Sequence, residues 1–190
     1  MKTESWLKPL MRLPLSLRPL AALQRRHFGQ VLNPLRFWGR TPFLFWLVAL
    51  FFGHLERRKS PLSPTLRALL MTRISQLCHC AFCIDANSLR LANSSGSLEK
   101  VLAVADWQNS TLFDDTERLA LEYAEAATAT PPRQDTDLQQ RLRARFTEHE
   151  ITEITALIAF QNLSARFNSA LAIPDHGLCP LPQTETKKDV

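Results

Sequence analysis

The chain has 190 residues, of which 45% are hydrophobic and 22% are charged. This length suits one domain with an appended arm, and the ordinary composition excludes a wholly disordered chain. The chain has only 5 glycines and lacks the hairpin-forming pairs Asn-Gly and Asp-Gly, which argues against a β-sandwich or barrel and predicts an all-α fold.

The formal net charge of +5 is unevenly distributed along the chain. Residues 1–60 carry eleven Lys or Arg residues against two acidic residues, whereas residues 61–190 carry twelve against sixteen. A basic arm before an acidic body suits nucleic acid, an anionic membrane or an acidic partner. Because no recognisable nucleic-acid module accompanies the arm, we expect no nucleic-acid binding.

Residues 1–40 form this basic arm, which is also rich in proline. Pro9, Pro14, Pro19 and Pro34 interrupt any long amphipathic helix of the kind that a transit peptide forms. We therefore expect an irregular arm that wraps around the body of the protein.

The most apolar segment follows the arm and reads PFLFWLVALFFG over residues 42–53. A membrane-spanning helix needs about 17–25 apolar residues, so this run predicts a buried or subunit-interface helix instead. Thr41 is placed to cap that helix, and Pro42 suits its first turn. We expect the exposed part of Phe43 to Phe52 to join copies into a homo-oligomer, and together with the basic arm it would also suit contact with a membrane surface.

Capping signals and apolar spacing predict the remaining helices. Ser63 with Pro64 begins the helix that leads to the cysteines, and capping boxes at Asp114 and Thr147 begin two later helices. Pro174 ends the last of them, so we expect a helical domain over residues 41–174 and a loose C-terminal tail over 175–190. The expected bundle has roughly seven helices, which start near residues 42, 64, 81, 97, 115, 138 and 148.

Three of the four cysteines lie within six residues, at Cys78, Cys80 and Cys83, and the fourth is Cys179. Residues three apart share one face of a helix, so Cys80 and Cys83 are close enough to form a disulfide. Near a helix start, the positive end of the helix dipole favours thiolate over thiol. The spacing therefore predicts a redox-capable pair.

Two other interpretations of the cysteines remain open. Cys78, Cys80 and Cys83 with His176 or Cys179 would supply the four ligands that structural zinc requires. However, zinc ligands usually come from two separated turns, whereas this triplet lies between helical segments, so our leading interpretation includes no metal and no other cofactor. The plainer alternative is that the cysteines are small buried apolar residues.

The residues around the cysteines resemble a known family. The segment Thr65–Ser88, TLRALLMTRISQLCHCAFCIDANS, looks like the core of the carboxymuconolactone decarboxylase family in its alkylhydroperoxidase D-like branch. The segments 112–128 and 146–173 resemble later helices of that family, and 42–55 is similar to the apolar helix before the core in longer members. The resemblance covers about residues 30–175.

This resemblance implies an all-helical, oligomeric bundle that reduces hydroperoxides with a cysteine pair. Cys83 would be the peroxidatic cysteine that attacks the peroxide, and Cys80 would be the resolving cysteine that then forms a disulfide with it. The implied partners are a hydroperoxide substrate and a thiol or dithiol reductant protein. Because a reactive dithiol needs a reducing supply, we expect a cytoplasmic location.

Two positions depart from the family pattern. Asn87 stands where the family has a histidine that accepts the thiol's proton, and Ala68 stands where it has a glutamate. An asparagine cannot act as a base near neutral pH. The alternative function is therefore a non-catalytic or differently employed helical binding protein on the same scaffold.

Other side chains near the pair are candidates for roles in the site. His79 lies four residues before Cys83 and is a candidate base if the two share a helix face. Helical geometry points Asp85 away from Cys83, so we expect it to be solvated. Arg166 and Asn168 of the last helix are candidates to line the pocket.

Overall fold

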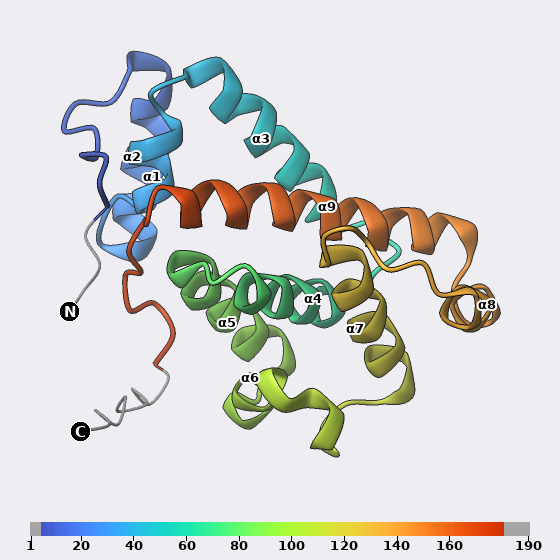
Figure 1. Ribbon diagram of the computed structural model, residues 1–190. Coiled ribbons are helices and arrows are strands. Elements are labelled where there is room, and N and C mark those ends of the chain that lie inside the picture. The colour runs from blue at the N-terminus through green and yellow to red at the C-terminus, as the bar shows by residue number, and fades with distance from the viewer. Residues whose placement is uncertain (1–4, 181–190) are drawn as a thin grey trace, which may run out of the picture.

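The computed structural model describes residues 5–180, and within this range the chain is all-helical, with no β-strand (Figure 1). The all-α expectation is confirmed. The elements are a 3-10 helix η1 (Leu15–Leu17), α1 (Arg18–Phe28), α2 (Asn33–Trp38), α3 (Pro42–Leu55), α4 (Pro64–Leu77), α5 (Ala81–Ser95), α6 (Leu98–Ala103), a second 3-10 helix η2 (Val104–Asn109), α7 (Asp115–Thr128), α8 (Thr136–Arg145) and α9 (Glu148–Ala170).

Helix α4 is the centre of the bundle and packs against α5, α7 and α9. Its side chains Leu69 and Ile74 are fully buried in one apolar core with Leu121 of α7 and Leu157 of α9. In Figure 1, α9 runs across the molecule with α4 below it and α3 above it. The central position of α4 holds its C-terminal end, and the cysteines that follow, in a rigid setting.

Three of the expected helix caps are present. The Ser63 hydroxyl accepts a hydrogen bond from the Leu66 N–H, and Asp114 and Thr147 each form a complete capping box. The expected cap at Thr41 is wrong, because its side chain makes no capping hydrogen bond and its hydroxyl instead donates to the carbonyl of Trp38.

The N-terminal arm is more regular than expected. Pro19 and Pro34 stand in the first turns of α1 and α2, where a backbone N–H has no partner within the helix. These prolines therefore begin helices instead of breaking them, and the expectation of an irregular arm is wrong over 15–38. The segment before η1 packs on the end of α9, where the Trp6 indole donates to the carbonyl of Ala170 at 2.8 Å.

The beginning of the C-terminal segment is also ordered. Residues 171–180, named here the C-terminal strap, pack against α5, and Ile173 and Cys179 within it are buried. The expectation of a loose tail is therefore wrong for 175–180. The remainder of that tail, 181–190, lies outside the described residues.

Helix α3 is strongly apolar, yet most of its side chains are exposed to solvent. Its only buried residue is Leu55, whereas Phe43 is 78% exposed and Leu50 is 68% exposed. Over residues 5–180, no helix combines the length and the apolarity that crossing a bilayer requires.

Candidate active site

The cysteines occupy the turn between α4 and α5. Helix α4 ends at Leu77, His79 adopts a left-handed conformation with φ 50°, and Cys80 is the N-cap of α5. The Cys80 Sγ accepts a hydrogen bond from the Cys83 N–H at 3.2 Å. A sulfur thus takes the place that a serine, threonine or aspartate oxygen usually takes at a helix start.

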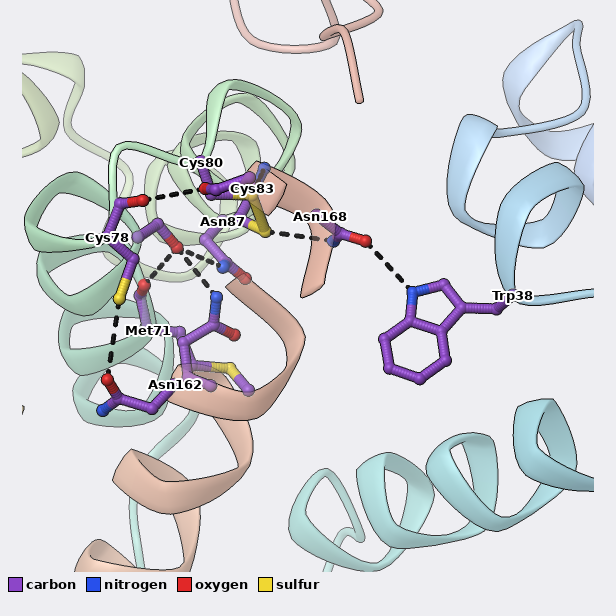
Figure 2. Close-up of a disulfide and its surroundings, with 11 residues drawn as sticks. Trp38, Met71, Cys78, Cys80, Cys83, Asn87, Asn162 and Asn168 are labelled. Carbon is purple, nitrogen blue, oxygen red and sulfur yellow. Dashed lines mark hydrogen bonds between the residues drawn. A yellow bond between two sulfur atoms is a disulfide. The ribbon is translucent and has the colours of Figure 1, made fainter. Parts of the chain in front are cut away.

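Cys80 and Cys83 are joined by a disulfide, with their Cα atoms 5.2 Å apart (Figure 2). The pair is buried, at 1% exposure for Cys80 and 4% for Cys83. It lies in a small apolar cluster that includes Phe37 and Ile173, so the N-terminal arm and the C-terminal strap both cover it. A cavity of about 580 Å³ lies between α7, α8 and α9, and neither cysteine lines it.

One polar side chain of α9 reaches the disulfide. The Asn168 Nδ2 donates to the Cys83 Sγ at 3.3 Å, and the Trp38 Nε1 donates to the Asn168 Oδ1 at 3.0 Å. Figure 2 shows the three groups in a row, from the sulfur through the amide to the indole ring. Asn168 is 1% exposed, so its amide is fixed by these partners.

Asn87, at the position of the family's histidine, belongs to a separate buried network. Its Nδ2 donates to the Ser75 Oγ at 3.1 Å, and Arg90 donates to its Oδ1 at 3.1 Å. Glu56 pairs with Arg90 at 2.5 Å, and Gln161 also donates to Ser75. Both polar atoms of the Asn87 amide are therefore engaged with these groups.

His79 does not share a helix face with Cys83. Because α5 begins only at Ala81, the left-handed turn places His79 outside the helix, and the residue is exposed. Among the described residues, no hydrogen bond joins its ring to Cys80 or Cys83. The structure therefore does not bring the candidate base to the pair.

Cys78 is a free cysteine that points away from the disulfide. Its thiol contacts the Asn162 Oδ1 at 3.6 Å, and Figure 2 shows it directed toward that residue. Burial raises the pKa of the Cys78 thiol, and the nearby Arg166 guanidinium offsets part of that rise. Of the two expected pocket residues on α9, Asn168 thus faces Cys83 and Arg166 faces Cys78.

Asp85 anchors the C-terminal strap. Its carboxylate accepts the backbone N–H of His176 at 3.0 Å and that of Cys179 at 2.8 Å, and the residue is only 9% exposed. The expectation that Asp85 is solvated is wrong, because helical geometry gives its direction but not the segment that covers it. Asn33 adds two further contacts to the strap, since its N–H donates to the His176 Nε2 and its side chain donates to the carbonyl of Pro174.

The groups proposed as zinc ligands do not converge. Within residues 5–180, no three His, Cys, Asp or Glu side chains are grouped so that they could hold a metal ion. His176 is instead part of the strap, where burial lowers its pKa and leaves its Nε2 free to accept the Asn33 N–H. Burial and the Asp85 charge raise the pKa of Cys179.

Sequence reasoning did not find the contacts of Trp38, Ser75 and Asp85 with this site. No local motif marks them, because their partners lie far along the chain. For Asn168, the available signal was its place in the segment of α9 that resembles the family's closing helix.

Comparison with known sequences identifies relatives of the chain. A model of the carboxymuconolactone decarboxylase family matches residues 42–126. The uncharacterized protein YnjA of Escherichia coli (strain K12) is 58% identical over 177 residues, which cover 93% of this chain and 97% of YnjA.

Comparison with solved structures shows the same fold. An uncharacterized peroxidase-related protein from Ralstonia eutropha JMP134, described as an alkylhydroperoxidase AhpD core, has a TM-score of 0.80 at 19% identity over 89% of this chain and 91% of that one. The debrominase Bmp8 has a TM-score of 0.78 at 23% identity over 92% and 94% of the two chains. Together with the family match and the identity to YnjA, these likenesses show that the chain belongs to the carboxymuconolactone decarboxylase family and has the AhpD-like helical fold.

Proposed function

We propose that the protein is a thiol-dependent hydroperoxide reductase that works through Cys80 and Cys83. The observation that carries this proposal is the pairing of the two sulfurs at the start of α5, where the helix dipole favours a thiolate. Membership of a family with a peroxidase-related structural neighbour supports it. The same fold also occurs in a protein named as a debrominase, so the substrate needs a direct test.

The proposed reaction has three steps. The Cys83 thiolate attacks one oxygen of ROOH, the O–O bond breaks, and RO⁻ leaves and takes a proton from solvent to give ROH. The Cys80 thiol then attacks the resulting sulfenic acid, which forms the disulfide and releases water. A dithiol reductant restores both thiols and is itself oxidised to a disulfide, so the proposal places the protein in a reducing compartment, the cytoplasm.

The division of roles between Cys83 and Cys80 follows the family resemblance, and each sulfur accepts one N–H. The Cys83 sulfur accepts an N–H from Asn168, whereas the Cys80 sulfur accepts the N–H of Cys83 itself. Neither Asn87 nor His79 is placed to take the Cys83 proton. We therefore assign that proton to solvent.

The proposal is tested by counting thiols before and after peroxide treatment. The fully reduced protein has four cysteines, and a stoichiometric amount of an organic hydroperoxide should remove two thiols and yield one equivalent of the alcohol. Cys83→Ser should abolish alcohol formation. Cys80→Ser should still form the alcohol but stop at the sulfenic acid, which a dimedone label detects by mass spectrometry.

Cys179→Ser is the matched control, because Cys179 is buried and free. This variant should still lose two thiols. An unchanged thiol count in the wild-type protein would exclude the reductase and favour the alternative, a helical binding protein on the same scaffold.

We also propose that α3 joins this chain to a second copy. The seven large exposed side chains of α3 present on the order of 700 Å² if each offers roughly 200 Å² when fully exposed. This is close to the ~800 Å² per partner of a standard interface. Residues 42–53 contain no charged residue, so α3 lacks the polar face of a helix that lies on a membrane surface. These side chains are Phe43, Leu44, Trp46, Leu47, Leu50, Phe51 and Phe52.

Leu50→Asp should convert the oligomer to a monomer, as measured by light scattering after size exclusion, because it places a charge within the apolar contact. Leu102→Asp on α6 is the control, since Leu102 is 51% exposed and lies away from α3. A monomeric wild-type protein that sediments with phosphatidylglycerol vesicles would instead assign α3 to a membrane surface.

A further inference from the structure

The orientation of the Asn168 amide is determined by its neighbours. An indole N–H can only donate, so the Trp38 Nε1 at 3.0 Å requires an oxygen opposite it. The other end of the amide, which faces the Cys83 Sγ at 3.3 Å, must then be the NH₂ group.

A fixed N–H donor has a definite effect on a sulfur that alternates between thiol and thiolate. A donor stabilises the charged form and therefore lowers the pH at which the proton leaves. The effect is strengthened because both Asn168 and Trp38 are buried, at 1% and 5% exposure, and because the indole polarises the amide. A carboxamide cannot take up the proton, so its contribution is to the anion alone.

In the described part of the chain, neither of the candidate bases is placed to accept the Cys83 proton. The amide of Asn87 is bonded to Ser75 and Arg90, and His79 lies exposed in the turn. The Cys83 thiolate therefore depends on hydrogen-bond stabilisation, with its proton released to solvent, more than on proton transfer to a neighbouring side chain.

We propose, on the basis of the proposed reductase function, that Asn168 is a catalytic residue that stabilises the Cys83 thiolate, and that Trp38 is the positioning residue that orients its amide. This pair favours the thiolate by donating to it, whereas the resemblance implies a histidine at the position of Asn87 that accepts the proton. The two residues come from opposite ends of the chain, so the arm that carries α2 is part of the site.

The test measures the thiolate of Cys83 directly. In a background of Cys78→Ser, Cys80→Ser and Cys179→Ser, Cys83 is the only thiol, and absorbance at 240 nm against pH gives the midpoint of its ionisation. Asn168→Asp keeps the shape and the acceptor for Trp38 but replaces the donor with a negative charge. It should raise the midpoint by about one to two units, which is roughly a tenfold to hundredfold loss of thiolate at a fixed lower pH.

Two further variants complete the test. Trp38→Phe keeps the ring but loses the indole N–H, and it should raise the midpoint by less than Asn168→Asp. Asn162→Asp is the matched control on α9, because Asn162 contacts Cys78 and not Cys83, and it should leave the midpoint unchanged. In the protein with all four cysteines, Asn168→Asp should move the rising limb of the pH profile for peroxide reduction upward by the same amount.

A purely structural role for Asn168 predicts a different outcome. Asn168→Asp raises the midpoint through its own charge whatever the role of the amide, so the deciding variant is Asn168→Leu, which removes the donor and adds no charge beside the sulfur. Stabilisation of the thiolate by the amide predicts that Asn168→Leu raises the midpoint by about one unit. If the residue only held Trp38, Asn168→Leu would leave the midpoint within a few tenths of the parent value, which would overturn the proposal. Failure of the reductase function itself is distinguishable, since wild-type protein would then lose no thiols to peroxide whatever the Cys83 midpoint.

Discussion

Asp85→Ala is expected to accelerate reduction of the Cys80–Cys83 disulfide by about 30-fold to 1000-fold. The substitution removes the acceptor of two backbone N–H groups, those of His176 and Cys179. A buried donor without a partner costs about 1–3 kcal/mol, so opening of the C-terminal strap should become easier by roughly 2–4 kcal/mol. Because each 1.4 kcal/mol is a factor of ten, reduction that depends on this opening accelerates accordingly.

The rate is measured with a dithiol or phosphine reductant, followed by alkylation and mass spectrometry at successive times. Asp114→Ala is the control, because it removes a helix cap at the start of α7, away from the cysteines. This control should leave the reduction rate within about twofold. Equal rates for Asp85→Ala and the wild type would mean that the strap does not limit access to the disulfide.

Access of peroxide and reductant to the two sulfurs distinguishes this site from a solvent-exposed thiol. At 1% and 4% exposure, the two sulfurs cannot meet a peroxide or a reductant unless a covering segment moves. The strap is held to α5 through Asp85 and to α2 through Asn33, and the Phe82 and His176 rings meet edge to face at 6.0 Å. These few contacts make local opening of the strap less costly than unfolding of the α4 core.

Ser75→Ala is expected to lower the free energy of unfolding by about 2–4 kcal/mol, or the melting temperature by roughly 5–15 °C. Ser75 is fully buried, and its hydroxyl accepts hydrogen bonds from Asn87 of α5 and Gln161 of α9 while it donates to the carbonyl of Met71. Without the hydroxyl, two amide donors remain buried and unpaired. One oxygen atom therefore connects three helices.

Guanidinium unfolding of the oxidised protein measures this loss. Thr72→Val is the matched control three residues away on α4. Thr72 is as fully buried as Ser75, but its hydroxyl donates to the carbonyl of Ala68 within its own helix and connects no other helix. The substitution should cost about 1 kcal/mol or less. A loss of similar size in both variants would show that the contacts between helices at Ser75 contribute little.

Local signals predicted most helix starts. Ser63, Asp114 and Thr147 act on N–H groups within three residues of themselves, so their effect does not depend on the rest of the fold. Local signals gave the wrong prediction at Pro19 and Pro34. A proline in the interior of a helix breaks it, whereas a proline in the first turn suits it. Which of the two roles a proline takes depends on where the helix begins.

In the candidate site, too, local spacing predicted one feature and missed another. The spacing of Cys80 and Cys83 predicted a pair at a helix start, and the structure joins them there. The left-handed turn at His79 was not predicted, and a register argument that assumed a continuous helix placed its ring on the wrong side.

By itself, the sequence determined the helical class, most helix starts and the position of the cysteine pair, because caps, prolines and apolar periodicity act within a few residues. Only the tertiary structure decided what surrounds the sulfurs. Trp38 meets Asn168 across 130 positions of the chain, and Asp85 meets the strap across more than 90. Contacts between residues so far apart in the sequence form when whole helices pack on a common core. Local sequence motifs therefore do not mark them.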